Sequence, residues 1–277
     1  MIFYCCFSLT LSHCKPNLFK HIELDGDQMK IYCICIILLF STLIFGQDLS
    51  LVEPTSLIDT PTAGTLMRGS FQAEIRAYSN GGLLGSIDVG ITDRLMLGLS
   101  YGATNLIGTG DVDGNPQPGV HLRYRVFEED LAIPALVLGY DSQGFGTYID
   151  STERYSEKSP GIFVAASKNF VFLGTFGLHG GVNYSLENND GDKDLNLFCG
   201  FDKSINPELL LVGEYDFAMN DNNTKSLGAG NGYLNVGLRW IFAGKMNIDF
   251  MLKNLLKNKN DHPHMSREIR ISYVEIF

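Results

Sequence analysis

The chain has 277 residues, of which 45% are hydrophobic and 19% are charged, and its formal net charge is -10. This apolar content excludes a disordered chain, and the negative charge argues against nucleic acid as a partner. After Gly46 no apolar run approaches the roughly 18 residues of a membrane-spanning helix, so a helical membrane protein is also excluded for that part of the chain.

The first 46 residues have the layout of an export signal behind an extension. Residues 29–46 start with a methionine, carry one lysine and end at the small residue Gly46. Their apolar run of about 15 residues is shorter than the ~20 of a spanning helix. This layout predicts a secretory signal peptide and a mature chain from Gln47, with a single membrane anchor as the alternative. Residues 1–28 are then interpreted as a mis-called extension upstream of the true start, Met29.

Cysteine usage agrees with export. Of the six cysteines, five precede Gly46 and only Cys199 follows it. A mature chain with one cysteine forms no internal disulfide, so its stability must come from elsewhere. No small-residue box precedes Cys33 or Cys35, which argues against a lipid-anchored N-terminus.

From Gly69 to the end, apolar and polar residues alternate with a period of two, which predicts β-strands. Segments of about ten residues suit strands that cross a bilayer at a tilt. Residues 47–68, which carry two prolines, are expected to form a periplasmic lead-in to the barrel domain at 69–277. The twelve predicted strands cover residues 69–78, 83–91, 95–105, 119–127, 134–143, 161–170, 175–187, 193–202, 208–219, 232–242, 246–255 and 267–277.

The connections between these strands alternate in length. Short periplasmic turns and long external loops are typical of an up-and-down outer-membrane barrel, whereas a Greek-key sandwich has no reason to keep this rhythm. The connection at 79–82 departs from it, because it is external and short. The tight turns lie at 92–94, 171–172, 204–207 and 243–245, and the long loops at 106–118, 142–160, 188–192, 220–231 and 256–266.

Alternation gives each strand an apolar and a polar face. In the strand at 119–127, for example, Val120, Leu122, Tyr124 and Val126 share one side. A soluble barrel turns such a face inward and a membrane barrel turns it outward, so alternation alone does not decide between them. The export signal and the aromatic residues near strand ends favour the outward orientation.

With the apolar face outward, charges of both signs line the lumen. Because unpaired buried charges are very costly, these groups must be wetted by a channel or cross-linked as a polar plug, and the sequence leaves both open. The tight turn at 243–245 predicts that Arg239 stands directly opposite Asp249 across two strands. By parity the candidate lumen residues are Glu74, Arg76, Asp88, His121, Arg123, Arg125, Asp141, His179, Glu214, Asp216, Arg239, Asp249 and Arg270.

One motif has the spacing of a hydrolase nucleophile elbow. Ser100 lies at the centre of Gly98–Gly102, but that chemistry needs a strand-to-helix turn, and here the motif lies inside an alternating strand. His121 and His179 point to the lumen and are the best candidates for catalytic residues. The sequence shows no recognisable serine or carboxylate partner for either histidine. We therefore expect lumen packing and predict no catalytic residue.

Two further motifs resemble metal sites. Asp111, Asp113 and Asn115 have the spacing that opens a calcium loop, but a proline follows where glycine is needed and the twelfth position is not acidic. His262 and His264 flank a proline in a loop, where histidines are usually solvated. We predict no metal site and no cofactor.

The chain ends in an alternating segment, 270–277, whose final residue is Phe277. This segment resembles the closing strand of bacterial outer-membrane β-barrels, in which the terminal aromatic residue is read by the insertion machinery. The resemblance implies an all-β, up-and-down antiparallel transmembrane barrel of about 12 strands in the outer membrane. It also implies membrane lipid and the barrel assembly machinery as partners, with Tyr273 and Phe277 as the assembly signal.

The segments at 80–85, 206–208 and 237–240 resemble the YjbH-type barrels linked to exopolysaccharide export. Two functions follow as expectations. The first is passive or selective permeation or export of a small solute or polysaccharide through a polar lumen. The second is a structural or secretion-accessory barrel with a closed lumen, and an outer-membrane hydrolase is the third alternative.

Overall fold

The computed structural model describes residues 53–260 and 264–277. The predicted extension at 1–28, the signal peptide at 29–46, the start at Gln47 and His262 lie outside the described residues. Within them, no helix is long and apolar enough to cross a lipid bilayer.

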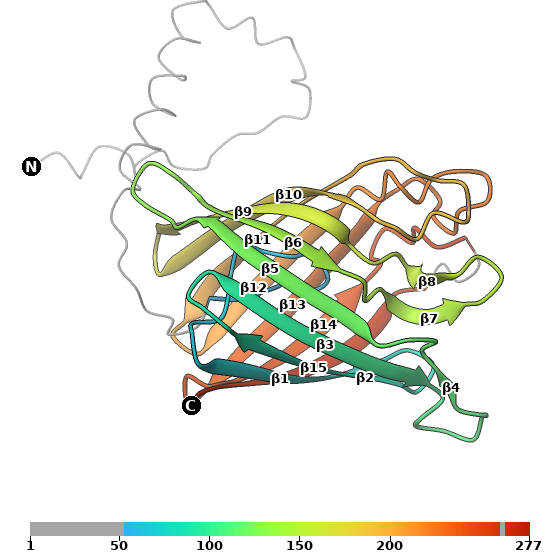
Figure 1. The fold of residues 1–277 in the computed structure, drawn as a ribbon, viewed down its shortest axis with the longest axis horizontal. Helices are drawn as coiled ribbons and strands as arrows, with labels where there is room; N and C mark the ends of the chain where they lie inside the picture. The colour runs from blue at the N-terminus through green and yellow to red at the C-terminus, as the bar shows by residue number, and fades with distance from the viewer. Residues whose placement is uncertain (1–52, 261–263) are drawn as a thin grey trace, which may run out of the picture. The chain divides into compact units, whose positions relative to one another are not determined.

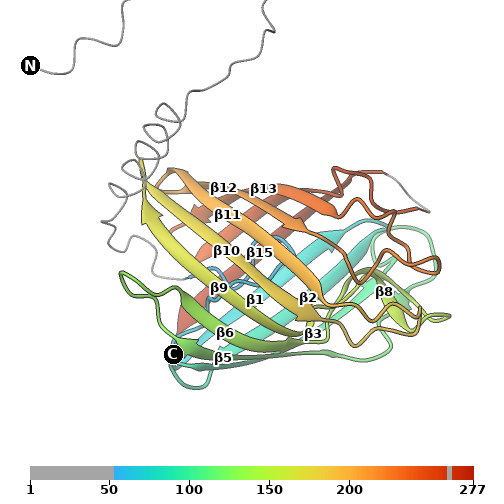
Figure 2. The same ribbon diagram turned by 90° about the horizontal axis from the view of Figure 1, so that it is seen from above.

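The chain forms a closed antiparallel barrel (Figures 1 and 2). Its sheet has thirteen strands, of which the two-residue β4 (Asp113–Gly114) is an appendage to β3, so twelve form the wall. Neighbours in sequence pair along the wall, and β1 pairs with β15 to close it. The wall strands are β1 (Ser70–Tyr78), β2 (Gly82–Gly90), β3 (Leu95–Thr104), β5 (Gly119–Phe127), β6 (Ala135–Asp141), β9 (Gly161–Val171), β10 (Thr175–Tyr184), β11 (Asn196–Asn206), β12 (Leu209–Asp216), β13 (Tyr233–Phe242), β14 (Met246–Lys253) and β15 (Ser266–Ile276).

The apolar face of the wall points outward, as expected. Ile75, Leu99 and Phe250, from three different strands, are each at least half exposed, whereas polar residues at alternate positions are buried. At the end of the barrel that carries the short turns, the rings of Trp240 and Phe242 lie 6.1 Å apart. A closed barrel with an apolar belt and rim aromatics is the transmembrane architecture of the outer-membrane type.

The predicted twelve strands are confirmed, with local differences. β11 extends to Asn206, so the following turn is shifted by irregular pairing at 204–206. A bulge at 125–127 turns Phe127 outward in place of the predicted Val126. The external loop at 142–160 also contains a hairpin that the sequence did not predict, formed by β7 (Phe145–Ile149) and β8 (Arg154–Glu157).

The register predicted around the 243–245 turn is confirmed. Phe242 stands opposite Met246, and Arg239 stands opposite Asp249. Ala243 and Gly244 both have positive φ angles, of 52° and 68°. Two such residues make the tight turn whose twist matches that of the adjoining strands, and this geometry fixes the register.

Residues 53–66 lie inside the barrel, whereas the sequence led us to expect a periplasmic lead-in over 47–68. Their blue trace is enclosed by the strands in both views (Figures 1 and 2). The segment enters from the end with the short turns and contacts β5, β12, β13 and β15. We call residues 53–66 the plug segment.

Candidate functional site

The plug segment folds back on itself in a tight turn. The Leu57 amide donates to the Thr60 carbonyl at 3.0 Å, and the Thr62 amide donates to the Thr55 carbonyl at 3.1 Å. These bonds satisfy the arms of the turn and leave the amides at its tip and several carbonyls directed outward. Buried backbone groups of this kind need partners on the barrel wall.

Glu214 on β12 provides the partner for the tip. Its carboxylate accepts hydrogen bonds from the amides of Ile58, Asp59 and Thr60 at 2.9–3.0 Å, and from the Thr60 hydroxyl at 2.8 Å. Asn235 on β13 donates to the same carboxylate at 2.8 Å. Hydrogen bonds to a charged acceptor are stronger than those between neutral groups, so one wall side chain holds the whole tip.

Two arginines hold the carbonyls behind the tip. Arg239 donates to the Leu57 carbonyl at 2.8 Å, and Arg270 donates to the Leu57 and Ile58 carbonyls at 2.7 and 3.0 Å. Both guanidinium groups also bond Asp249, each through an Nε at 2.9 Å. Asp249 therefore fixes two cations that together bind the backbone of the plug.

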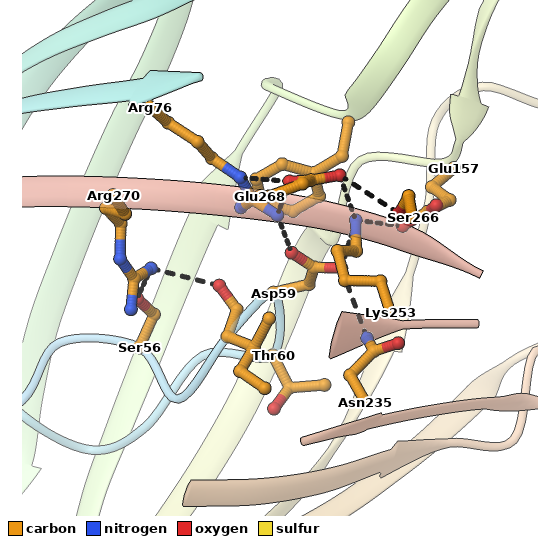
Figure 3. Close-up of polar contacts among 12 residues, drawn as sticks. Ser56, Asp59, Thr60, Arg76, Glu157, Asn235, Lys253, Ser266, Glu268 and Arg270 are labelled. Carbon is orange, nitrogen blue, oxygen red and sulfur yellow. Dashed lines mark hydrogen bonds and ion pairs between the residues drawn. The ribbon is translucent and has the colours of Figure 1, made fainter. Parts of the chain in front are cut away.

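Asp59 lies between two cations at the top of the plug (Figure 3). Its carboxylate is 2.6 Å from Arg76 of β1 and 2.7 Å from Lys253 of β14. Glu268 of β15 lies 2.6 Å from Arg76. Burial raises the pKa of Asp59 to about 6, although Lys253 and Arg76 oppose this rise.

The external loop at 142–160 reaches the same cations from the opposite side. Glu157 lies 2.6 Å from the Lys253 ammonium, and the ring of Phe145 lies 4.3 Å from Arg76 and 5.2 Å from Lys253. Although burial raises it, Lys253 and Lys259 hold the pKa of Glu157 well below its usual range. The plug and this loop thus meet on one pair of wall cations.

Two more arginines bind the plug nearer the end of the barrel that carries the short turns. Arg123 donates to the carbonyls of Thr55 and Thr62. Arg125 donates to the Glu53 carboxylate and, at 3.2 Å, to the carbonyl of Ala63. Cationic contacts therefore follow the plug from Glu53 to Asp59.

Apolar side chains complete the fit. Leu57 and Ile58 are almost fully buried against Val212 and Met251 of the wall. Each such side chain contributes roughly 1.5–3 kcal/mol when it leaves water. Ala63 fills a second apolar patch, and Leu66 packs beside Met96 and Val274.

The lumen is closed in this state. Wall charges such as Arg76, Glu214 and Arg270 are at most 4% exposed, whereas an open aqueous channel would wet them. A cavity of about 40 Å³ remains between the plug tip and the outer loops. It holds only a few water molecules, since each needs about 10–15 Å³.

The structure places the thirteen predicted lumen residues on the inner side of the wall, and it brings six of them onto the plug itself. Arg76, Arg123, Arg125, Glu214, Arg239 and Arg270 contact the plug segment directly. Asp249 bridges two of these arginines, and Glu74 lies 3.8 Å from Arg270. Asp216 instead accepts a hydrogen bond from Asn196 at 2.7 Å.

Sequence reasoning missed Asp59, Lys253 and Glu268. The last two share the parity of Asp249 and Arg270, so strict parity would have found them. Asp59 had no such signal, because the plug segment has no strand periodicity.

His121 has the carboxylate and serine partners that the sequence did not identify. Its Nδ1 lies 2.9 Å from Asp88 and its Nε2 lies 3.2 Å from Ser100, on adjacent strands. However, the Ser100 hydroxyl donates to Gln143 at 2.9 Å and is 3% exposed. A nucleophile must be reached by its substrate, and here Gln143 of the external loop covers the serine.

His179 also lies between a serine and a carboxylate, but its Nδ1 faces the serine and its Nε2 faces the carboxylate, the reverse of His121. Its Nδ1 lies 2.8 Å from Ser167 and its Nε2 lies 2.7 Å from Asp202. The Ser167 hydroxyl accepts a hydrogen bond from the Ala63 amide at 2.8 Å. This Asp202–His179–Ser167 chain of hydrogen bonds therefore anchors the plug to β9.

No group of three or more His, Cys, Asp or Glu side chains is placed to hold a metal ion within residues 53–260 and 264–277. Asp111 and Asp113 of the calcium-like motif are exposed, and Asp113 pairs with Thr104 as part of β4.

No protein-family model matches the chain, and no curated protein matches it. Among solved structures, it is similar to the KdgM porin, with 8% identity, a TM-score of 0.42 and coverage of 75% of this chain and 99% of that one. It is also similar to Omp33 of Acinetobacter baumannii, with 8% identity, a TM-score of 0.44 and coverage of 75% and 97%. For the NanC porin these values are 10%, 0.37, 75% and 98%. None of the scores reaches 0.5, so the barrel assignment depends on the strand pairing itself.

Proposed function

We propose that the protein is an outer-membrane channel for a small polar solute, and that the plug segment closes it at rest. The observation that carries this proposal is the attachment of the plug. It joins the wall at one end, ahead of Gly69, and its contacts with the wall are non-covalent. It can therefore leave the lumen while the twelve-strand pairing stays intact.

The wall behind the plug supports permeation. Withdrawal of residues 53–66 would leave Arg239, Arg270 and Glu214 facing an empty space. Such groups favour water over a dry cavity, so the space would fill with water. The exported chain would take outer-membrane lipid and the barrel assembly machinery as partners.

A permanently closed accessory barrel is the second candidate. It is favoured by the apolar wall residues Val212, Met251 and Phe163, which a constantly open channel would expose to water. Complete burial of Leu57 and Ile58 also makes spontaneous opening rare. The two candidates differ in whether the plug ever leaves.

A reversible covalent tether distinguishes them. The Ala63 amide lies 2.8 Å from the Ser167 hydroxyl, so cysteines at these two positions should be close enough to form a disulfide. The double variant Ala63→Cys/Ser167→Cys, with Cys199→Ser, is placed in planar bilayers. Under reducing conditions we expect intermittent current steps at raised voltage, and oxidation should abolish them.

Each single-cysteine variant is the matched control, and oxidation should leave its currents unchanged. Silence of the reduced protein at every voltage would favour the permanently closed barrel. Currents that persist after oxidation would show that the plug is not the gate.

A further inference from the structure

The contacts of the plug with the wall are strongly biased in charge. Six cationic side chains from five wall strands bond to it, whereas Glu214 is the one wall carboxylate in the described part of the chain that does so. Asp249 and Glu268 pair with the cations themselves. The six cations are Arg76, Arg123, Arg125, Arg239, Lys253 and Arg270.

What the plug offers these cations is oxygen. Arg123, Arg239 and Arg270 bind backbone carbonyls. Arg125 binds the Glu53 carboxylate, and Arg76 binds that of Asp59. The plug therefore presents a row of carboxylate and carbonyl acceptors to the cations of the wall.

Two of the arginines retain unused donors. Arg76 Nη1 and Arg125 Nε are buried and have no hydrogen-bond partner among the described residues. An unsatisfied buried donor on a charged group is costly, and a guanidinium remains charged at any physiological pH. These donors favour a ligand richer in acceptors than the plug.

We propose that the footprint of the plug is a binding site for a solute that carries several carboxylate or phosphate groups, and that this solute displaces the plug. This inference builds on the proposed channel, because it names the class of solute and the event that opens the lumen. Guanidinium groups match both oxyanions through paired hydrogen bonds. The solute would engage Arg123 and Arg125 first, since they lie nearest the periplasmic entry of the segment.

The test measures plug release in the full-length protein. Thr62 is buried, and among the described residues its side chain bonds only within the plug, to the Pro54 carbonyl and the Gly64 amide. In the variant Thr62→Cys/Cys199→Ser, maleimide labelling of the plug peptide is followed by mass spectrometry. Citrate and tripolyphosphate are the probes, at constant ionic strength, with raffinose as the neutral control.

We expect both anions to accelerate labelling, by about tenfold at ten times their dissociation constant, and raffinose to have no effect. Arg125→Gln should raise the basal rate and weaken the response to the anions. Lys168→Gln is the matched control, because Lys168 pairs with Glu129 away from the plug and its loss should leave the response intact. Equal acceleration by sodium chloride, or an unchanged response in Arg125→Gln, would overturn the site.

Conductance recorded on the same samples separates this inference from the proposed function. If anions release the plug and no current follows, the proposed anion site is supported and the proposed channel function is contradicted. If currents follow reduction of the tether but anions do not release the plug, the proposed channel function is supported and the proposed anion site is contradicted.

Discussion

At the scale of single residues, Asp249 determines how the inner wall is arranged. It accepts hydrogen bonds from both Arg239 and Arg270, and both arginines hold the plug backbone. Loss of this carboxylate would leave two buried guanidinium groups without their shared counter-ion. Loss of Arg239 alone would leave Asp249 still paired with Arg270.

We expect Asp249→Ala to destabilise the folded barrel more than Arg239→Ala does. Removing one partner of a buried ion pair costs about 3–5 kcal/mol, because the remaining charge is unpaired. The double variant should lose less stability than the sum of the two. Urea unfolding in detergent, read by the gel shift of the folded barrel, measures all three, and additive losses would show that the pair does not interact.

Ser100 should not behave as a catalytic nucleophile, despite its relay to His121 and Asp88. Gln143 accepts a hydrogen bond from the Ser100 hydroxyl and covers it. We expect no labelling of Ser100 by a fluorophosphonate probe, and no loss of any esterase activity in Ser100→Ala. Specific labelling at this serine would revive the hydrolase alternative.

At the scale of elements, the sequence predicts the strands and fails on the plug. A strand can be predicted from its own residues, because successive side chains face lipid and lumen in turn and so alternate between apolar and polar. The plug is held chiefly through backbone amides and carbonyls, groups that are not particular to any residue type and so leave no signal in the sequence. The prolines of the plug predict only an irregular segment. The interior position of Asp59 depends on contacts with β1, β12 and β14, which are distant in the sequence.

Docking of the plug should depend on pH through Asp59. Its pKa is about 6 when docked, against an ordinary value of about 3.9 when released. The docked state therefore binds the extra proton between these values, so docking strengthens as the pH falls from about 6 to about 4. The difference amounts to at most about 3 kcal/mol. We expect fewer channel openings at pH 4.5 than at pH 7.5.

Asp59→Asn is the control for this effect. It removes the titrating group and leaves Glu157, Glu214 and Glu268, the other acids around Asp59 and its two cations. The pH dependence in this window should largely disappear. If the variant keeps the full dependence, the titrating group lies among those acids and not on the plug.

At the scale of the whole molecule, closure of the barrel depends on the first and last wall strands. The Phe277 amide donates to the Gly69 carbonyl at 2.8 Å, and its ring lies 5.1 Å from that of Phe71. We predict that deletion of Phe277 lowers the yield of heat-modifiable barrel in the membrane. Channel properties of the barrels that do fold should be unchanged. An unaltered yield would count against Phe277 as part of the assembly signal.

The signal at 29–46 leads to a prediction about the exported chain. Cleavage after Gly46 would place the plug segment a few residues from the mature N-terminus. Mass spectrometry of the outer-membrane form should find Gln47, in part cyclised, as the first residue. A terminus at Met1 or Met29 would contradict the prediction.

The position of the plug also sets an order for biogenesis. The plug is made before any wall strand, yet Ile58 bonds Arg270, which follows it by 212 residues in the sequence. Its docking surface is therefore completed only when β15, the last strand, is in place. A chain shortened before β15 would lack Arg270 and its hydrogen bonds to the Leu57 and Ile58 carbonyls. Sealing of the lumen is therefore coupled to completion of the barrel, because the last strand supplies part of the surface that holds the plug.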